Sequence, residues 1–152
     1  MKPVMQSAPI NILLADDNVD DIFLFRKALS EIHLQTHLTT VMDGEQLMHH
    51  LSVNCEVNPD ILFLDIIMPR KSGLECLSEI KENAKLKYIP IVMFATPFTR
   101  GPVIDLDVKN VFDKKGADSY IHKTSDAAQL KLDIYKALVS LIKKRSINLP
   151  SD

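Results

Sequence analysis

Two runs of the chain are apolar at every position, and this feature constrains the fold most strongly. Residues 61–64 read Ile-Leu-Phe-Leu, and residues 91–95 read Ile-Val-Met-Phe-Ala. Strands with one face in water alternate apolar and polar residues, whereas continuously apolar strands are typical of parallel sheets covered by helices on both faces. Both runs are far shorter than the ~18 apolar residues of a membrane span. They therefore predict central strands of a parallel sheet.

The other segments alternate between strand and helix patterns along the chain. Strands are predicted at residues 10–15, 36–42, 61–64, 91–95 and 119–122. Helices are predicted at residues 20–32, through Leu47 to Leu51, at 74–81, at 103–115, and from Ser125 or Asp126 to about Arg145. Strict alternation implies parallel strands joined by right-handed crossovers, and hence an open α/β sheet with five helices on its two faces. We expect one domain at residues 10–145, with tails at 1–9 and 146–152.

Composition excludes several classes of protein. The chain has 152 residues, and its 18 Lys and Arg against 20 Asp and Glu lack the basic excess that drives binding to nucleic acid. Cys55 and Cys76 are too few for a disulfide scaffold. No segment has the length of a membrane span or the apolar core of a signal peptide. We therefore expect a cytoplasmic protein that binds neither nucleic acid nor membrane directly.

Charged residues stand where the predicted strands end. Asp16 and Asp17 follow the first strand, Asp65 follows the third, and Lys123 follows the fifth. Ligands of open parallel sheets bind outside the carboxyl ends of the strands, so these side chains should meet at one edge. Three carboxylates there repel one another unless a cation neutralises them, and carboxylate oxygens suit Mg²⁺. A neighbouring lysine can pair with a phosphoryl group. The set predicts Mg²⁺-assisted phosphoryl transfer with an Asp nucleophile.

A simpler interpretation exists for each acid taken alone, because Asp is common in turns and helix caps that follow strands. The joint arrangement of acids after two strands and a lysine after a third favours the phosphoryl-transfer site.

Several motifs then occur in a characteristic order over about residues 10–144. They are Leu13 to Asn18, Asp43-Gly44, Leu64 to Pro69 with Gly73, Ile89-Pro90, and Gly116 to Lys123. In this order they resemble the receiver domain of two-component response regulators, the family of the single-domain chemotaxis regulator. The resemblance implies a flavodoxin-like doubly wound sheet with strand order 2-1-3-4-5.

The resemblance also implies roles for the charged residues. Asp65 would accept a phosphoryl group from a phosphohistidine on a sensor histidine kinase. Asp16, Asp17, Asp65 and the backbone carbonyl of Ile67 would hold Mg²⁺, and Lys123 would pair with the acyl phosphate. Such a protein is not an enzyme acting on a separate substrate, because it catalyses only its own phosphorylation and dephosphorylation. It would signal to a target protein or a phosphotransfer domain through a phosphorylation-driven change of its interaction face.

The residues that would switch the protein and tune its dephosphorylation depart in part from the family's pattern. Tyr120 matches the family's aromatic switch position, but the position of the switch Ser or Thr is taken by Ala95, and Thr96 follows it. Either Thr96 contacts the phosphoryl group or that hydroxyl contact is missing. Ile67 and Pro97 occupy positions that in the family tune hydrolysis of the acyl phosphate. Neither side chain can orient a water molecule, so we expect slow autodephosphorylation.

Alternatives of other classes stay open at this point. A degenerate receiver would act as an interaction module without phosphorylation. A small Mg²⁺-dependent phosphatase would share the chemistry, but the sequence has no second acid close after Asp65 to serve as general acid. The last helix carries two apolar stripes, one of which would pack on the sheet while the other forms a partner or homodimer face. These stripes are Leu130, Ile134, Ala137, Leu138 and Leu141, and Leu132, Tyr135, Val139 and Ile142.

Overall fold

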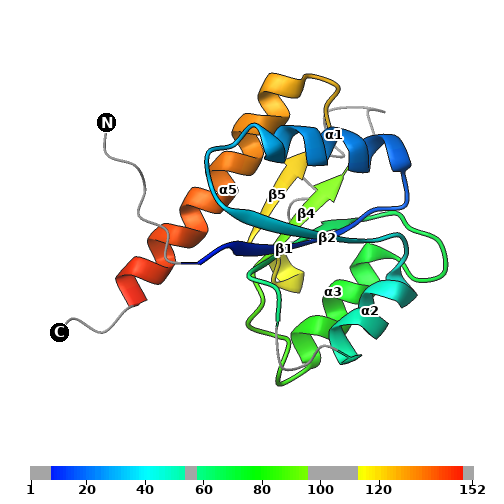
Figure 1. Ribbon diagram of the computed structural model, residues 1–152. Coiled ribbons are helices and arrows are strands. Elements are labelled where there is room, and N and C mark those ends of the chain that lie inside the picture. Colours follow the sequence, from blue (N-terminus) through cyan, green and yellow to red (C-terminus); the bar gives the residue numbers. More distant parts are fainter. Residues whose placement is uncertain (1–7, 54–57, 96–112, 149–152) are drawn as a thin grey trace.

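The computed structural model describes residues 8–53, 58–95 and 113–148 (Figure 1). Within these ranges the strands are β1 (Ile10–Ala15), β2 (Thr36–Val41), β3 (Ile61–Asp65), β4 (Ile91–Ala95) and β5 (Ser119–His122). They form one parallel sheet in the order β2-β1-β3-β4-β5. The described helices are α1 (Val19–Ser30), α2 (Gly44–Val53), α3 (Gly73–Glu82) and α5 (Ala127–Asn148).

The predicted doubly wound α/β fold and its strand order are confirmed. The predicted helix at 103–115 lies mostly outside the described residues, although residues 113–115 are helical. Asp126 caps α5 by accepting hydrogen bonds from two backbone N–H groups of its first turn, and α5 continues past the predicted end near Arg145 to Asn148. None of the helices in the described ranges is long and apolar enough to cross a membrane.

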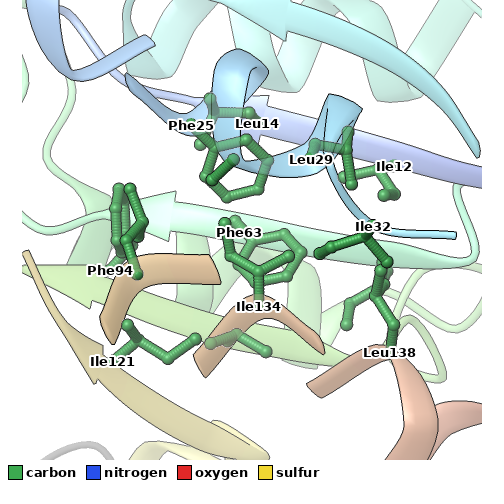
Figure 2. Close-up of a cluster of buried hydrophobic side chains, with 14 of the residues drawn as sticks. Ile12, Leu14, Phe25, Leu29, Ile32, Phe63, Phe94, Ile121, Ile134 and Leu138 are labelled. Atoms are coloured by element: carbon green, nitrogen blue, oxygen red, sulfur yellow. The ribbon is translucent and has the colours of Figure 1, made fainter. Parts of the chain in front are cut away.

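One face of the sheet is covered by α1 and α5, which lie on the same side in Figure 1. Figure 2 shows the core of this face, in which buried apolar residues of β1, β3, β4 and β5 meet the two helices; Leu38 of β2 packs against the same core. Phe25 of α1 sits at its centre, with its ring centroid 4.9 Å from that of Phe63 on β3 and 5.8 Å from that of Phe94 on β4. Both pairs are edge-to-face, an arrangement that aromatic rings favour. This packing fixes α1 over the middle of the sheet.

The other face of the sheet is covered by α2 and α3. Leu62, Leu64 and Met93 point to this side, so β3 and β4 are buried on both faces, as their continuous apolar sequences predict. Cys76 of α3 is a buried free thiol in this core, and burial raises its pKa to about 11. It is therefore protonated and unreactive at neutral pH. Cys55 lies outside the described residues.

Candidate functional site

A small pocket opens at the carboxyl ends of β1, β3, β4 and β5. Its volume is about 190 Å³, and we call it the acidic pocket. It is lined by Asp17, Asn18, Asp21, Asp65, Ile66, Ile67, Ala95 and Lys123. A larger cavity of about 740 Å³ lies between β5 and α5, where Lys123 also lines it, but it contains none of the pocket's carboxylates. The carboxylates of Asp17, Asp21 and Asp65 line the smaller pocket together with Lys123, so this pocket is the candidate site.

Asp16 directly follows β1, and backbone pairing at the end of the sheet holds it in place. Its backbone N–H donates to the carbonyl of Val41 over 3.0 Å, which continues the pairing of β1 with β2. Its Oδ1 accepts a hydrogen bond of 2.9 Å from the backbone N–H of Asn18. The other oxygen, Oδ2, is buried and pairs with the ammonium of Lys123, whose Nζ lies 2.7 Å away. Burial raises the pKa of Asp16, and the nearby Lys123 ammonium only partly opposes this.

Asp65 is the last residue of β3 and its carboxylate is largely buried. Its pKa is raised to about 7: burial is the largest cause and the charges of Asp16 and Asp17 add to it, whereas Lys123 opposes the rise. The carboxylate oxygens of Asp16, Asp17 and Asp65 include a set that lies within 4.8 Å of one another. Asp17 is exposed, so this group is reachable from solvent.

Lys123 provides the positive charge of the site, and its side chain is only 9% exposed. Its backbone N–H donates to the carbonyl of Ala95 over 2.7 Å, which places it just beyond the end of β4. The Nζ atom lies 2.7 Å from Oδ2 of Asp16 and 3.2 Å from Oδ2 of Asp65. Burial by itself would lower the pKa of this lysine, but the surrounding carboxylates outweigh burial and raise it. The ammonium therefore stays charged.

The segment after Asp65 folds tightly back against β3. The backbone N–H of Gly73 donates to the carbonyl of Ile66 over 2.7 Å, and Ser72 caps α3 by accepting from the N–H of Glu75. A Cβ atom at Gly73 would lie only 1.9 Å from the carbonyl oxygen of Asp65. Only glycine fits this close approach of backbones, so Gly73 determines where Asp65 lies.

The donor set fits a hard divalent cation. Mg²⁺ binds carboxylate and carbonyl oxygens, and the three neighbouring carboxylates supply such atoms without any His or Cys among them. The largely buried carboxylates of Asp16 and Asp65 share the Lys123 ammonium, and with Asp17 beside them an excess of negative charge remains that a divalent cation would neutralise. Ile67 also lines the pocket, with its side chain 57% exposed.

Of the residues expected to act in switching, the structure describes Ala95 and Tyr120. Ala95 lines the acidic pocket at the end of β4, whereas Thr96 and Pro97 lie outside the described residues. Tyr120 on the edge strand β5 is half-buried, and its hydroxyl lies 3.1 Å from Nδ1 of His122.

Sequence reasoning missed one acid of the acidic pocket and the capping role of another acid, Asp43. Asp21 lies in the first turn of α1, and its Oδ2 accepts a hydrogen bond of 3.0 Å from Nζ of Lys123. Asp43 is buried and caps α2, accepting from the N–H of Gln46 while the Gln46 side chain accepts from the N–H of Met42. The Asp-x-x-Gln spacing was a readable capping signal. Asp21 carried no comparable signal, because acids are common in the first turn of any helix.

Comparison with known proteins shows the family of this chain. Residues 12–135 match the model of the response regulator receiver domain family. The chain therefore belongs to the response regulator receiver family. It is 34% identical over 100 residues to response regulator Rcp1 of Synechocystis sp., covering 63% of this chain and 68% of that protein. It is 31% identical over 119 residues to chemotaxis protein CheY of Listeria monocytogenes, covering 78% of this chain and 93% of CheY.

Solved structures show the same similarity. The phosphorylated cyanobacterial phytochrome response regulator RcpA superposes with a TM-score of 0.72 at 31% identity, covering 86% of this chain and 91% of RcpA. The Mn²⁺-bound form of Rcp1 superposes with a TM-score of 0.71 at 27% identity, covering 84% of this chain and 91% of Rcp1.

Proposed function

We propose that this protein is a response regulator whose receiver domain accepts a phosphoryl group on Asp65 from a sensor histidine kinase. The observation that carries the proposal is the environment of Asp65. Its carboxylate stands in a pocket with two further carboxylates and 3.2 Å from the Lys123 ammonium. The phosphorylated state of the relative RcpA supports the same chemistry here. The proposed receiver unit comprises residues 10–145.

The mechanism follows from the charges in the acidic pocket. A carboxylate oxygen of Asp65 attacks phosphorus in line, an O–P bond forms, and the P–N bond to the kinase histidine breaks with its electron pair leaving on the imidazole. Lys123 contacts Asp65 from the side and can pair with oxygens of the transferred group. The pocket therefore supplies an acceptor and a fixed positive charge without large rearrangement.

Asp16, Asp17, Asp65 and the backbone carbonyl of Ile67 are the proposed Mg²⁺ ligands. When bound, the cation would supply neutralisation of the negative charge that gathers during transfer. The Mn²⁺-bound form of the relative Rcp1 supports a divalent cation at this kind of site. The protein would act on no separate substrate, because both its phosphorylation and its dephosphorylation take place on Asp65.

The output is proposed to be a shift between two conformations. A near-complete switch from 1:99 to 99:1 requires about 5.5 kcal/mol of preference for one state. Ala95 lines the acidic pocket and has no side-chain hydroxyl to offer the phosphoryl group. Thr96 therefore remains the proposed hydroxyl contact, and Tyr120 the proposed aromatic switch.

The proposed partners are a sensor kinase and a downstream protein or phosphotransfer domain, all in the cytoplasm. We propose a homodimer face on α5 as well. The stripe of Leu130, Ile134, Leu138 and Leu141 is buried against the sheet, whereas Leu132 and Tyr135 are exposed. The last helix thus keeps apolar side chains outside the core, where a partner can cover them. Replacing Leu132 by Asp should abolish a dimer seen by analytical ultracentrifugation; a wild-type monomer at high concentration contradicts it.

The experiment for phosphorylation uses the wild-type protein with Mg²⁺ and a small acyl or amidophosphate donor. Intact mass spectrometry should show the addition of one phosphoryl group, lost in Asp65→Asn and lost on chelation of Mg²⁺. Asp60→Asn is the matched control, because Asp60 immediately precedes the same strand at its opposite end. An unmodified wild-type protein would favour the degenerate receiver, and rapid turnover of donor would favour the phosphatase.

A further inference from the structure

We propose that Asp21 is a positioning residue that holds the Lys123 ammonium at the rim of the acidic pocket, which leaves Asp65 free to accept a phosphoryl group. This inference rests on the proposed function and deepens it. It concerns a residue 102 positions before its partner, brought to it only by the fold.

Geometry separates the contact with Asp21 from the other contacts of Lys123. Three carboxylates lie within 3.2 Å of Nζ, at 2.7 Å for Asp16, 3.0 Å for Asp21 and 3.2 Å for Asp65. The contact with Asp21 is a hydrogen bond, and Asp21 is the most exposed of the three acids, with its side chain 28% exposed against 0% for Asp16 and 8% for Asp65. Because hydrogen bonds are directional, this bond draws Nζ toward the outer side of the group. Asp21 therefore helps to orient the ammonium.

Rigid packing holds Asp21 in place. Its helix begins at the Asn18 cap, whose side chain accepts a hydrogen bond from the backbone N–H of Asp21 itself. One turn later, Phe25 packs edge-to-face against both Phe63 and Phe94. The ammonium of Lys123 lies 5.4 Å from the centroid of the same Phe94 ring, a cation–π contact. The Phe94 ring therefore contacts both Lys123 and Phe25, which lies on the same helix as Asp21.

The role of Asp21 follows from what Lys123 would do without it. The ammonium would retain two carboxylate neighbours, Asp16 and Asp65, which are a proposed metal ligand and the proposed acceptor. Drawn fully onto them, it would occupy the oxygens that must bind the cation and attack phosphorus. The side chain of Asp21 is 28% exposed, so its carboxylate holds the ammonium on the solvent side of the pocket.

A purely electrostatic role for Asp21 predicts the opposite sign. A further negative charge near the acceptor repels an anionic phosphodonor, so its removal alone would speed phosphorylation. A positioning role predicts that removal slows the reaction, and that it does so only when Lys123 is present. The sign of the change therefore discriminates between the two roles.

The test is a double-mutant cycle on phosphorylation by a small phosphodonor, with rates measured as a function of donor and Mg²⁺ concentration. Asp21→Asn should slow the maximal rate by about five- to tenfold and leave the apparent KM for the donor within about twofold. Asp21→Glu, which keeps the carboxylate, should recover part of the rate. Asp20→Asn is the matched control, since it removes the same charge from an exposed neighbour in the same helical turn.

In a Lys123→Met background, Asp21→Asn should cause no further slowing, because the residue acts through the lysine. Slowing of equal size in both backgrounds overturns the proposal, and so does a faster or unchanged rate for Asp21→Asn with Lys123 present. Thermal unfolding of each variant identifies any loss that comes from misfolding. Failure of the proposed function is distinct, since the wild-type protein itself would then remain unmodified.

Discussion

Strand β3 has a carboxylate at each end, and the two have opposite surroundings. Asp60 precedes the strand, and its Oδ2 accepts a hydrogen bond of 2.7 Å from the backbone N–H of Asn11, while its other oxygen pairs with Arg145 of α5. Asp65 ends the strand in a buried cluster of like charges that share one lysine, and its pKa is raised to about 7. The carboxylate of Asp60 ties structural elements together. The carboxylate of Asp65 is crowded by like charges, which favours the binding of a cation from outside.

The difference shows how function can be recognised in a fold that has many acids. A carboxylate with both oxygens satisfied contributes to stability, whereas one held among other acids costs stability until a ligand arrives. The following four predictions test this contrast between the two ends of β3.

The largest expected effect comes from Gly73→Ala at the Asp65 end. The added Cβ meets the Asp65 carbonyl oxygen, so the backbone must shift, and the free energy of unfolding should fall by about 3 kcal/mol. Phosphorylation should slow as well, because the acceptor moves. Gly116→Ala is the control: at a φ of +92° it should cost about 1 kcal/mol without changing the phosphorylation rate. Urea unfolding and phosphorylation assays of both variants check this, and equal effects on phosphorylation contradict it.

Exchanging the two acids for neutral residues should change stability in opposite directions. Asp60→Ala leaves the Asn11 N–H without its acceptor and frees Arg145, so it should lower the free energy of unfolding by about 2 kcal/mol. Asp65→Asn removes a buried charge, so in metal-free protein above neutral pH it should raise that free energy by about 1 to 2 kcal/mol. Chemical denaturation with a chelator present measures both. Two destabilised variants would remove the contrast.

A third prediction concerns pH. The folded-state pKa of Asp65 lies above its ordinary value of 3.8, so between about pH 4 and pH 7 the folded state binds a proton that the unfolded state does not. The contribution of Asp65 to stability is thus most favourable at low pH and decreases as pH rises, by at most about 1.4 kcal/mol per pH unit. The difference between metal-free wild type and Asp65→Asn should show this slope, and saturating Mg²⁺ should reduce it. A difference that grows in favour of the wild type with rising pH would refute the assignment.

The smallest effect concerns the lifetime of the acyl phosphate. Ile67 lines the acidic pocket with an exposed apolar side chain, which cannot orient an attacking water. Ile67→Asn should therefore speed dephosphorylation by about three- to tenfold, and Ile67→Val should not. Loss of label from isolated phosphoprotein measures the rates. Equal lifetimes for the Asn and Val variants would show that this position does not control water.

Much of the fold could be predicted because its determinants are local. The apolar runs gave the strands of the sheet, and the rule that parallel strands share one end brought Asp16, Asp17, Asp65 and Lys123 to one edge. β3 includes Asp65 itself, so the acceptor is fixed by strand pairing rather than by a loop.

Other features depend on distances across the fold. Nothing in the pattern separates Asp21 from its neighbour Asp20, because only the rotation of α1 over the sheet decides which acid reaches Lys123. The close approach of Gly73 to the Asp65 backbone is equally a tertiary property. Thr96 and the long segment after β4 lie outside the described residues, so their predicted roles stay predictions.

The packing of Phe25 between Phe63 and Phe94 also has a consequence for how the chain folds. Its partners come 38 and 69 residues later, and each strand of the sheet pairs only with distant segments. On a ribosome that synthesises from the N-terminus, α1 would emerge long before either ring that covers it. Because such non-local contacts must form together, a nascent chain ending before β4 would carry the acceptor aspartate but no stable core. Acquisition of a phosphorylatable site would therefore coincide with synthesis of the second half of the chain.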